Sequence, residues 1–118
     1  MSKLKTLEFL KNFSKKMKKR GKKIVLCHGV FDFPHLGHVK HFEAAKKFGD
    51  YLIVSLTEDK YVSKGINRPI YKEDQRVEFL SSFSIIDYVV IDRNSNAMNM
   101  ISKLKPNIYA KGQDYNLS

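Results

Sequence analysis

The chain has 118 residues, 42% of them hydrophobic, and this length allows one compact domain with a core of its own. No apolar run approaches the roughly 20 residues that span a bilayer, the N-terminus lacks a signal-peptide pattern, and a single cysteine excludes an internal disulfide. These observations predict a cytoplasmic protein without a membrane span.

The net charge of +10 comes almost entirely from the N-terminus. Residues 1–23 hold ten basic residues and one acidic residue (+9), whereas residues 24–118 hold twelve basic and eleven acidic residues (+1). The N-terminal lysines could bind a polyanion, but they also fit the solvated face of a helix, which is the interpretation we favour. Aromatic residues are not interleaved with them as in single-strand binders, so we do not expect nucleic acid as a partner.

The first elements in chain order are a helix, a strand and a second helix. The sequence predicts a short buried strand over residues 24–28, followed by a turn and a helix over residues 36–48. Gly49 falls where the end of a helix favours a left-handed residue. Before them, apolar residues at helical spacing predict an amphipathic helix ending near Gly21: Leu4, Leu7, Leu10, Phe13 and Met17.

The second half alternates in the same way. Residues 51–56 form an apolar run typical of a parallel strand covered on both faces, and Thr57 to Asp59 can cap a short helix. Strands alternating with helices predict βαβ units, and so an α/β, Rossmann-like three-layer fold with a mainly parallel sheet. The later segments are a loop (63–71), a helix (72–83), a strand (87–91), a helix capped by Asn96 and halted by Pro106, and a strand (108–111).

We divide the chain into a basic N-terminal helix and linker, residues 1–23, and a domain over residues 24–118. Ligands of parallel sheets bind beyond the carboxyl ends of the strands. Polar clusters follow three predicted strands, and we expect them to converge on one cleft: residues 29–38, 57–68 and 111–115.

The turn over residues 29–38 carries the clearest chemistry. A glycine-containing turn before a helix start can receive a phosphate, and Gly37 would let that phosphate approach the backbone. His35 and His38 lie three residues apart on one side of the first helical turn, where both can donate hydrogen bonds to anionic oxygens. Attack on the α-phosphate of a nucleoside triphosphate needs mainly positioning and charge neutralisation, which two imidazoles can supply.

Other polar residues add cations or leave alternatives. Lys64, Arg68 and Arg76 would supply the positive charge that phosphates require. Asp32 could bind a ligand or fix the turn through backbone hydrogen bonds, and both roles stay open.

The remaining histidines and the cysteine have simpler interpretations. His28 and His41 fit packing or surface positions, and Cys27 fits a small buried side chain in a strand. A zinc site that combines His41 with His35 and His38 is disfavoured, because helix positions six residues apart diverge by roughly 240°. The Gly-x-Gly-x-x-Gly fingerprint of nicotinamide and flavin enzymes is absent from the sequence.

The stretch Gly29-Val-Phe-Asp-Phe-Pro-His-Leu-Gly-His38 resembles the Gly-x-Phe-Asp-x-x-His-x-Gly-His signature of the cytidylyltransferase-like nucleotidyltransferases. It is most similar to the glycerol-3-phosphate cytidylyltransferases and the heptose-1-phosphate adenylyltransferase domains. Weaker matches follow in family order: residues 49–54, Asp59, residues 68–70, Arg76, residues 87–90 and residues 111–115.

The resemblance implies an enzyme that joins CTP or ATP to a phosphorylated sugar or polyol, releases pyrophosphate and makes a precursor for cell-envelope carbohydrate. It implies Mg²⁺ carried by the triphosphate, no metal ligands that need be histidines, and leaves a homodimer open. The implied catalytic residues are His35, His38 and Lys64. The implied nucleotide contacts are Val30, Phe31, His35, Leu36, Gly37, His38, Lys111, Gly112 and Asp114, and the implied acceptor or phosphate contacts are Asp32, Arg68 and Arg76.

Family members continue beyond the Lys111–Tyr115 segment to a further strand and a Ser/Thr-rich helix start that grips the triphosphate. This chain stops at Ser118, so we expect a domain truncated at its C-terminus. The departure keeps two alternatives to the enzyme: a nucleotide-binding module of the same fold without turnover, and a polyanion-binding protein that acts through the lysine-rich N-terminus.

Overall fold

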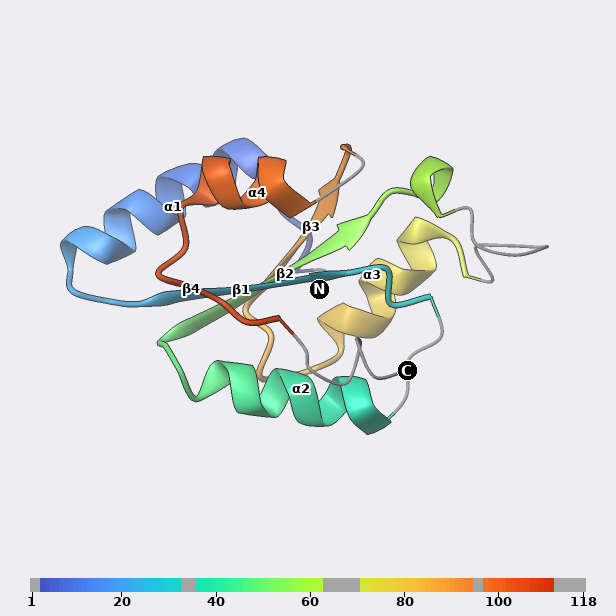
Figure 1. The fold of residues 1–118 in the computed structure, drawn as a ribbon, viewed down its shortest axis with the longest axis horizontal. Helices are drawn as coiled ribbons and strands as arrows, with labels where there is room; N and C mark the ends of the chain where they lie inside the picture. Colours follow the sequence, from blue (N-terminus) through green and yellow to red (C-terminus); the bar gives the residue numbers. More distant parts are fainter. Residues whose placement is uncertain (1–2, 33–35, 63–70, 95–96, 112–118) are drawn as a thin grey trace.

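A four-stranded parallel sheet forms the central layer of the protein, with helices on both faces (Figure 1). The computed structural model describes residues 3–32, 36–62, 71–94 and 97–111. The strands are β1 (Ile24–Gly29), β2 (Tyr51–Thr57), β3 (Tyr88–Asp92) and β4 (Ile108–Tyr109), in the spatial order β3-β2-β1-β4. Every pairing between them is parallel, which confirms the predicted α/β, Rossmann-like fold.

The two faces of the sheet are covered by different pairs of helices (Figure 1). Helices α1 (Leu7–Lys19) and α4 (Ala97–Leu104) lie on one face, and α2 (Leu36–Lys46) and α3 (Glu73–Ser81) lie on the other. A short 3₁₀ helix, η1 (Asp59–Tyr61), follows β2. Because side chains alternate along a strand, Val25 and Cys27 join the core under α2 and α3, and Leu26 joins the core under α1 and α4.

Helix α1, which lies within the predicted N-terminal unit of residues 1–23, packs against one face of the sheet. The Thr6 side chain caps the helix by accepting a hydrogen bond from the Phe9 N–H (3.1 Å). On its inner face Leu10 is fully buried, and the Ser14 hydroxyl donates to the carbonyl oxygen of Leu104 in α4 (3.0 Å). Helix α1 therefore carries lysines on its exposed side and an apolar stripe that covers one face of the sheet.

The residues before α1 pair with the outer edge of β3, which the sequence did not indicate. Leu4 forms a parallel bridge with Val89, where the Lys5 N–H donates to the Val89 carbonyl (2.9 Å). The Lys3 ammonium donates to the carbonyl oxygens of Phe83 and Ile86, each at 2.6 Å. This segment therefore covers backbone groups of an edge strand that would otherwise be open to other chains.

Gly49 is required for a reason other than the one predicted. Its backbone is not left-handed; among the described glycines only Gly21 has a positive φ, +77°. A Cβ atom at Gly49 would lie 2.6 Å from Val25 Cγ2 and 2.9 Å from the Lys23 carbonyl oxygen. The glycine thus allows the chain after α2 to pass against the start of β1.

Several element ends differ from the sequence prediction. Thr57 is the last residue of β2, and Glu58 precedes η1 without a capping hydrogen bond from its side chain. Strand β4 ends at Tyr109, two residues before the predicted end. The predicted Asn96 cap and residues 63–70 of the predicted loop lie outside the described residues.

Candidate active site

Phe31, in the turn after β1, has an uncommon backbone conformation. This residue has a φ of +54°, in the left-handed region that costs a bulky L residue roughly 1–2 kcal/mol. Its ring is nonetheless buried, and it packs on Phe42 of α2 with ring centroids 5.3 Å apart. At Gly29 a Cβ atom would lie only 2.8 Å from Phe31 Cζ, so the absence of a side chain there makes room for the ring.

Phe31 also positions His38, one of the two histidines of the motif. The two rings meet edge to face, with centroids 5.4 Å apart and planes at 75°. His38 lies in the first turn of α2, next to Gly37, and both residues are partly exposed. The positive end of the helix dipole is at this turn, so an imidazole held here can act together with it on an anion.

Asp32 ties the turn to the segment before α3. Its carboxylate oxygen Oδ1 accepts a hydrogen bond from the Tyr71 N–H (2.8 Å), and the residue is 6% exposed. The partner is 39 residues away in sequence rather than in the turn itself. Of the two roles left open for Asp32, this geometry favours fixing the turn, through a long-range bond.

Arg76 is a correction to the predicted phosphate contacts. Its side chain is 1% exposed, and its guanidinium is engaged by protein acceptors. Four hydrogen bonds fix it: Nη1 to the carbonyl oxygens of Val30 (2.9 Å) and Thr57 (2.7 Å), Nη2 to Asp59 Oδ1 (2.6 Å), and Nε to the Tyr71 carbonyl oxygen (3.1 Å). Arg76 therefore positions the ends of β1 and β2 from inside and does not face a ligand.

These contacts bring together two of the three polar clusters expected at one cleft. The Thr57 hydroxyl donates to the Gly29 carbonyl (3.4 Å), in addition to the links through Arg76. The third cluster is described only at Lys111, an exposed residue just after β4, the strand that pairs with β1. The described residues of all three clusters follow the carboxyl ends of neighbouring strands.

The other described residues of the predicted site are open to solvent. Val30 is 36% exposed and Leu36 is 65% exposed, so both can present backbone or side chain to a ligand. Five predicted site residues lie outside the described residues: His35, Lys64, Arg68, Gly112 and Asp114.

Cys27 and His41 face the interior beside the turn. Burial raises the pKa of the Cys27 thiol to about 12, so it is not a nucleophile at neutral pH. The Nε2 atom of His41 lies 3.5 Å from Cys27 Sγ, so His41 turns toward the sheet. The described residues contain no group of three His, Cys, Asp or Glu side chains that could hold a metal ion.

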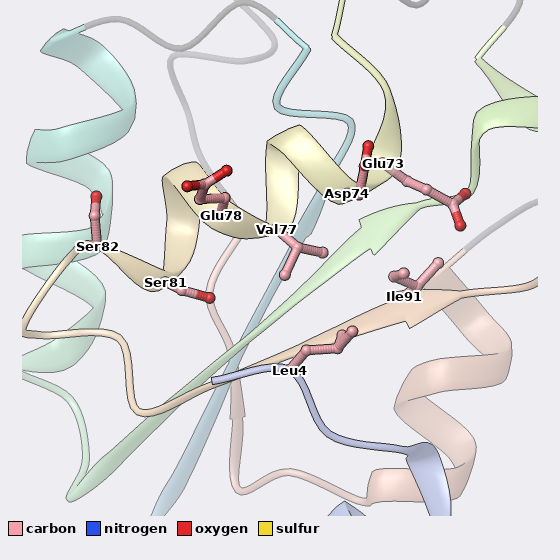
Figure 2. A pocket seen from close by; sticks show the side chains of 8 residues that line it. All are labelled: Leu4, Glu73, Asp74, Val77, Glu78, Ser81, Ser82 and Ile91. Carbon is pink, nitrogen blue, oxygen red and sulfur yellow. The ribbon is translucent and has the colours of Figure 1, made fainter. Parts of the chain in front are cut away.

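The pocket in Figure 2, of about 670 Å³, does not suit a phosphate. Leu4, Val77 and Ile91 come together in it from the N-terminal segment, α3 and β3. Its other lining includes three carboxylates of α3, which would repel phosphate: Glu73, Asp74 and Glu78. The nucleotide site is therefore expected at the turn and not here. None of the described helices is long and apolar enough to cross a membrane.

The position of the turn in the sheet defines the class of protein. From β1 the chain proceeds to β2 and β3 on one side and then to β4 on the other, so the strand order reverses between β1 and β4. Ligands of open α/β sheets bind in the crevice at such a reversal. A strand, a turn with a left-handed residue and a helix start with an imidazole therefore lie where α/β domains bind nucleotide phosphates.

The comparisons with known proteins place this class more closely. Residues 26–118 match the family described as cytidylyltransferase-like, and the chain belongs to that family. The family membership predicted from the motif is thereby confirmed.

The curated proteins that this chain resembles are much longer than the chain itself. The bifunctional protein HldE of Aliarcobacter butzleri is 41% identical over 116 residues, covering 97% of this chain and 24% of its own length. HldE of Nitratiruptor sp. is 44% identical over 118 residues, covering 93% of this chain and 26% of its own length. The chain thus spans about a quarter of the curated relatives that it matches.

A solved structure agrees with the fold. The lipopolysaccharide core biosynthesis protein of Thermoplasma volcanium superposes with a TM-score of 0.68 and 30% sequence identity. The match covers 75% of this chain and 73% of that one.

Proposed function

We propose that the chain transfers a nucleotidyl group from CTP or ATP to a phosphorylated sugar or polyol. An oxygen of the acceptor phosphate would attack the α-phosphorus and form the new bond, while the bond from the α-phosphorus to the bridging oxygen of the β-phosphate breaks. Pyrophosphate leaves with that oxygen. The product would be a nucleotide-activated sugar or polyol that serves as a precursor for cell-envelope carbohydrate.

The observation that carries this proposal is the position of His38 in the first turn of α2, where the strained residue Phe31 holds its ring. An imidazole fixed at a helix N-terminus can stabilise the charge that develops on the α-phosphate oxygens. The family match and the HldE relatives support the reaction class. The similarity to a lipopolysaccharide core biosynthesis protein supports an envelope carbohydrate as the destination.

The described residues divide this work between contact and support. His38, with the backbone at Gly37 and Val30, would contact the phosphates, and Lys111 would approach from the end of β4. Arg76 and Asp32 would keep the turn in place without touching the ligand. The contacts predicted for the residues outside the described ranges remain part of the proposal: His35, Lys64, Arg68, Gly112 and Asp114.

Magnesium would arrive bound to the triphosphate. The carboxylate of the turn, Asp32, is buried and already accepts a hydrogen bond from the Tyr71 N–H. We therefore expect phosphate and water oxygens, rather than this carboxylate, to hold the metal. When bound, the ion neutralises phosphate charge; the residues named above orient the phosphates. A homodimer, like a cytoplasmic location, stays a prediction.

A pyrophosphate-release assay tests the proposal against a nucleotide-binding module without turnover. The chain would be offered CTP or ATP together with glycerol 3-phosphate or a heptose 1-phosphate, with mass spectrometry of the product. We expect pyrophosphate and one nucleotide-linked product from one base. Thermal stabilisation by a nucleotide without any pyrophosphate would instead support the binding module.

A lysine-lined groove keeps polyanion binding as a second candidate. It lies between α1 and α4, encloses about 810 Å³, and Glu8 is the one acidic residue in the described lining. Lysines near helix C-termini also complement the helix dipole, which needs no ligand. Steeply salt-dependent heparin binding that is lost when these lysines are changed to glutamine would support it: Lys11, Lys15, Lys18, Lys19, Lys103 and Lys105.

A further inference from the structure

Three polar side chains from β1, β2 and β3 form a row across the sheet, near the carboxyl ends of these strands, where the phosphate site is proposed. His28 of β1 pairs in register with Ser55 of β2, and its Nδ1 lies 2.8 Å from the Ser55 hydroxyl oxygen. The same Nδ1 lies 3.9 Å from Oδ2 of Asp92, the last residue of β3. By strand alternation all three share the face covered by α1 and α4, opposite the face of Cys27.

Asp92 is incompletely satisfied in this row. The residue is fully buried, and its Oδ1 accepts a hydrogen bond from the Asn94 N–H (2.9 Å). Its Oδ2 is buried and has no hydrogen-bond partner among the described residues. The neighbouring Arg93 does not supply one, because its Nη1 donates to Glu58 (2.7 Å) and Glu73 (2.9 Å). A buried carboxylate oxygen without a partner is costly, so this arrangement requires an explanation.

A protonated His28 would place a cation within ion-pair distance of Asp92. Burial lowers the pKa of His28, and the Asp92 charge acts in the opposite direction. Of the charged groups in the described residues, Asp92 from β3 is the one that acts on the His28 pKa, and Glu58 at the end of β2 is held by Arg93. In the imidazolium form both ring nitrogens carry a hydrogen. The Nδ1–H would then donate to Ser55 Oγ, and the positive ring would lie 3.9 Å from Asp92 Oδ2.

The position of His28 connects this row to the ligand. His28 directly precedes Gly29 and the turn, and its side chain is 13% exposed. Leu26 pairs with Tyr109 across β1 and β4, so His28 and the exposed Lys111, each two residues further on, lie at about the same level. The strand order reverses between β1 and β4 (Figure 1). Open α/β sheets bind ligands in a crevice at such a reversal.

We propose that His28 is a phosphate-binding residue of this crevice, which takes up a proton from solvent when a phosphate binds and is held as an imidazolium by Asp92 and Ser55. Asp92 is then a positioning residue, because it acts on the ligand only through His28. The inference rests on the proposed function for the chemistry of the ligand. Both the nucleotide and the phosphorylated acceptor carry phosphate, and the experiment separates the two.

The test is a pH titration of the imidazole resonances of the whole chain by NMR, with His28 assigned through His28→Gln. Titrations would be run without ligand, with CTP, with ATP and with glycerol 3-phosphate. A negative charge within about 4–6 Å shifts a pKa by about 1–3 pH units, so we expect the His28 pKa to rise by at least 1 unit with the anion that binds beside it. Asp92→Asn should lower the His28 pKa in both the free and the anion-bound chain, because it removes the carboxylate charge that favours the imidazolium.

A binding measurement covers the case in which Asp92→Asn does not fold. The affinity of the chain for the active anion should weaken between about pH 6 and pH 8, and this weakening should be clearly smaller in His28→Gln, which lacks this imidazole. His41→Gln, a histidine directed at Cys27, should behave as wild type. An unchanged His28 pKa with an anion that moves the His38 resonance would overturn the inference and leave the proposed function standing. Binding of none of these anions would overturn both.

Discussion

Arg76 Nη1 lies 2.9 Å from the carbonyl oxygen of Val30, a residue 46 positions earlier in the chain. The same nitrogen lies 2.7 Å from the Thr57 carbonyl, so one buried guanidinium joins the ends of β1 and β2. The proposed phosphate turn therefore depends on a side chain in α3 that has no direct access to the ligand.

Removal of this guanidinium should destabilise the fold strongly. Arg76→Met keeps much of the side-chain volume but leaves three carbonyls and Asp59 without their donor, which should cost about 3–5 kcal/mol in urea unfolding. Arg93→Met is the matched control, since the Arg93 side chain is 56% exposed and its ion pairs should contribute at most about 1 kcal/mol. Equal losses in the two variants would contradict the structural role of Arg76.

Gly49 should resist substitution because a Cβ atom there would be too close to the Val25 side chain and to the Lys23 carbonyl oxygen. In Gly49→Ala the new Cβ would meet Val25 Cγ2 at 2.6 Å, and such overpacking costs about 1–3 kcal/mol. Val25→Ala should relieve part of this cost, so a double-mutant cycle should show a coupling of at least about 0.5 kcal/mol. Gly21→Ala, where nothing lies within 4 Å of the new atom, should add to Val25→Ala without coupling.

His28 should make the stability of the free chain dependent on pH. Its folded pKa is lowered below the ordinary value of 6.5, so the unfolded chain binds more protons and the unfolding free energy falls as pH decreases from about 6.5 through the folded pKa. Urea unfolding of His28→Gln should lack this part of the decrease. Identical pH profiles for the variant and the wild type would show that His28 is not buried as a neutral group.

Cys27 should be inert in the folded chain. Burial raises its pKa to about 12 and the residue is fully buried, so a thiol reagent at pH 8 should label it only after local or global unfolding. The labelling rate in urea should rise along with the fraction unfolded. Rapid labelling in native buffer would contradict the burial of β1.

Most elements could be predicted because their apolar patterns are regular. The continuous run over β2 and the alternation of strands and helices were enough for the parallel sheet, and the single motif around His38 was enough for the family. Element ends were less certain, since the limits of β4 depend on which backbone groups find partners on β1.

The buried polar residues could not be assigned from sequence. From the sequence alone, Arg76 is a candidate phosphate ligand like any other arginine of the polar clusters. Only the tertiary fold shows that its guanidinium donates four hydrogen bonds to protein acceptors. The row of His28, Ser55 and Asp92 joins residues of three strands that no local spacing relates. The strain at Phe31 was likewise hidden, as a left-handed phenylalanine has no sequence signal.

The most direct test of nucleotidyl transfer at this turn is pyrophosphate release by His38→Ala, compared with His41→Ala in the same chain. Loss of one preorganised hydrogen-bond donor to a developing charge typically lowers kcat about 10²–10³-fold, and we expect this for His38→Ala with the fold intact by circular dichroism. His41→Ala, whose imidazole contacts Cys27, should stay within about threefold of wild type, a change of roughly 0.7 kcal/mol. Full activity in a folded His38→Ala variant would contradict the account.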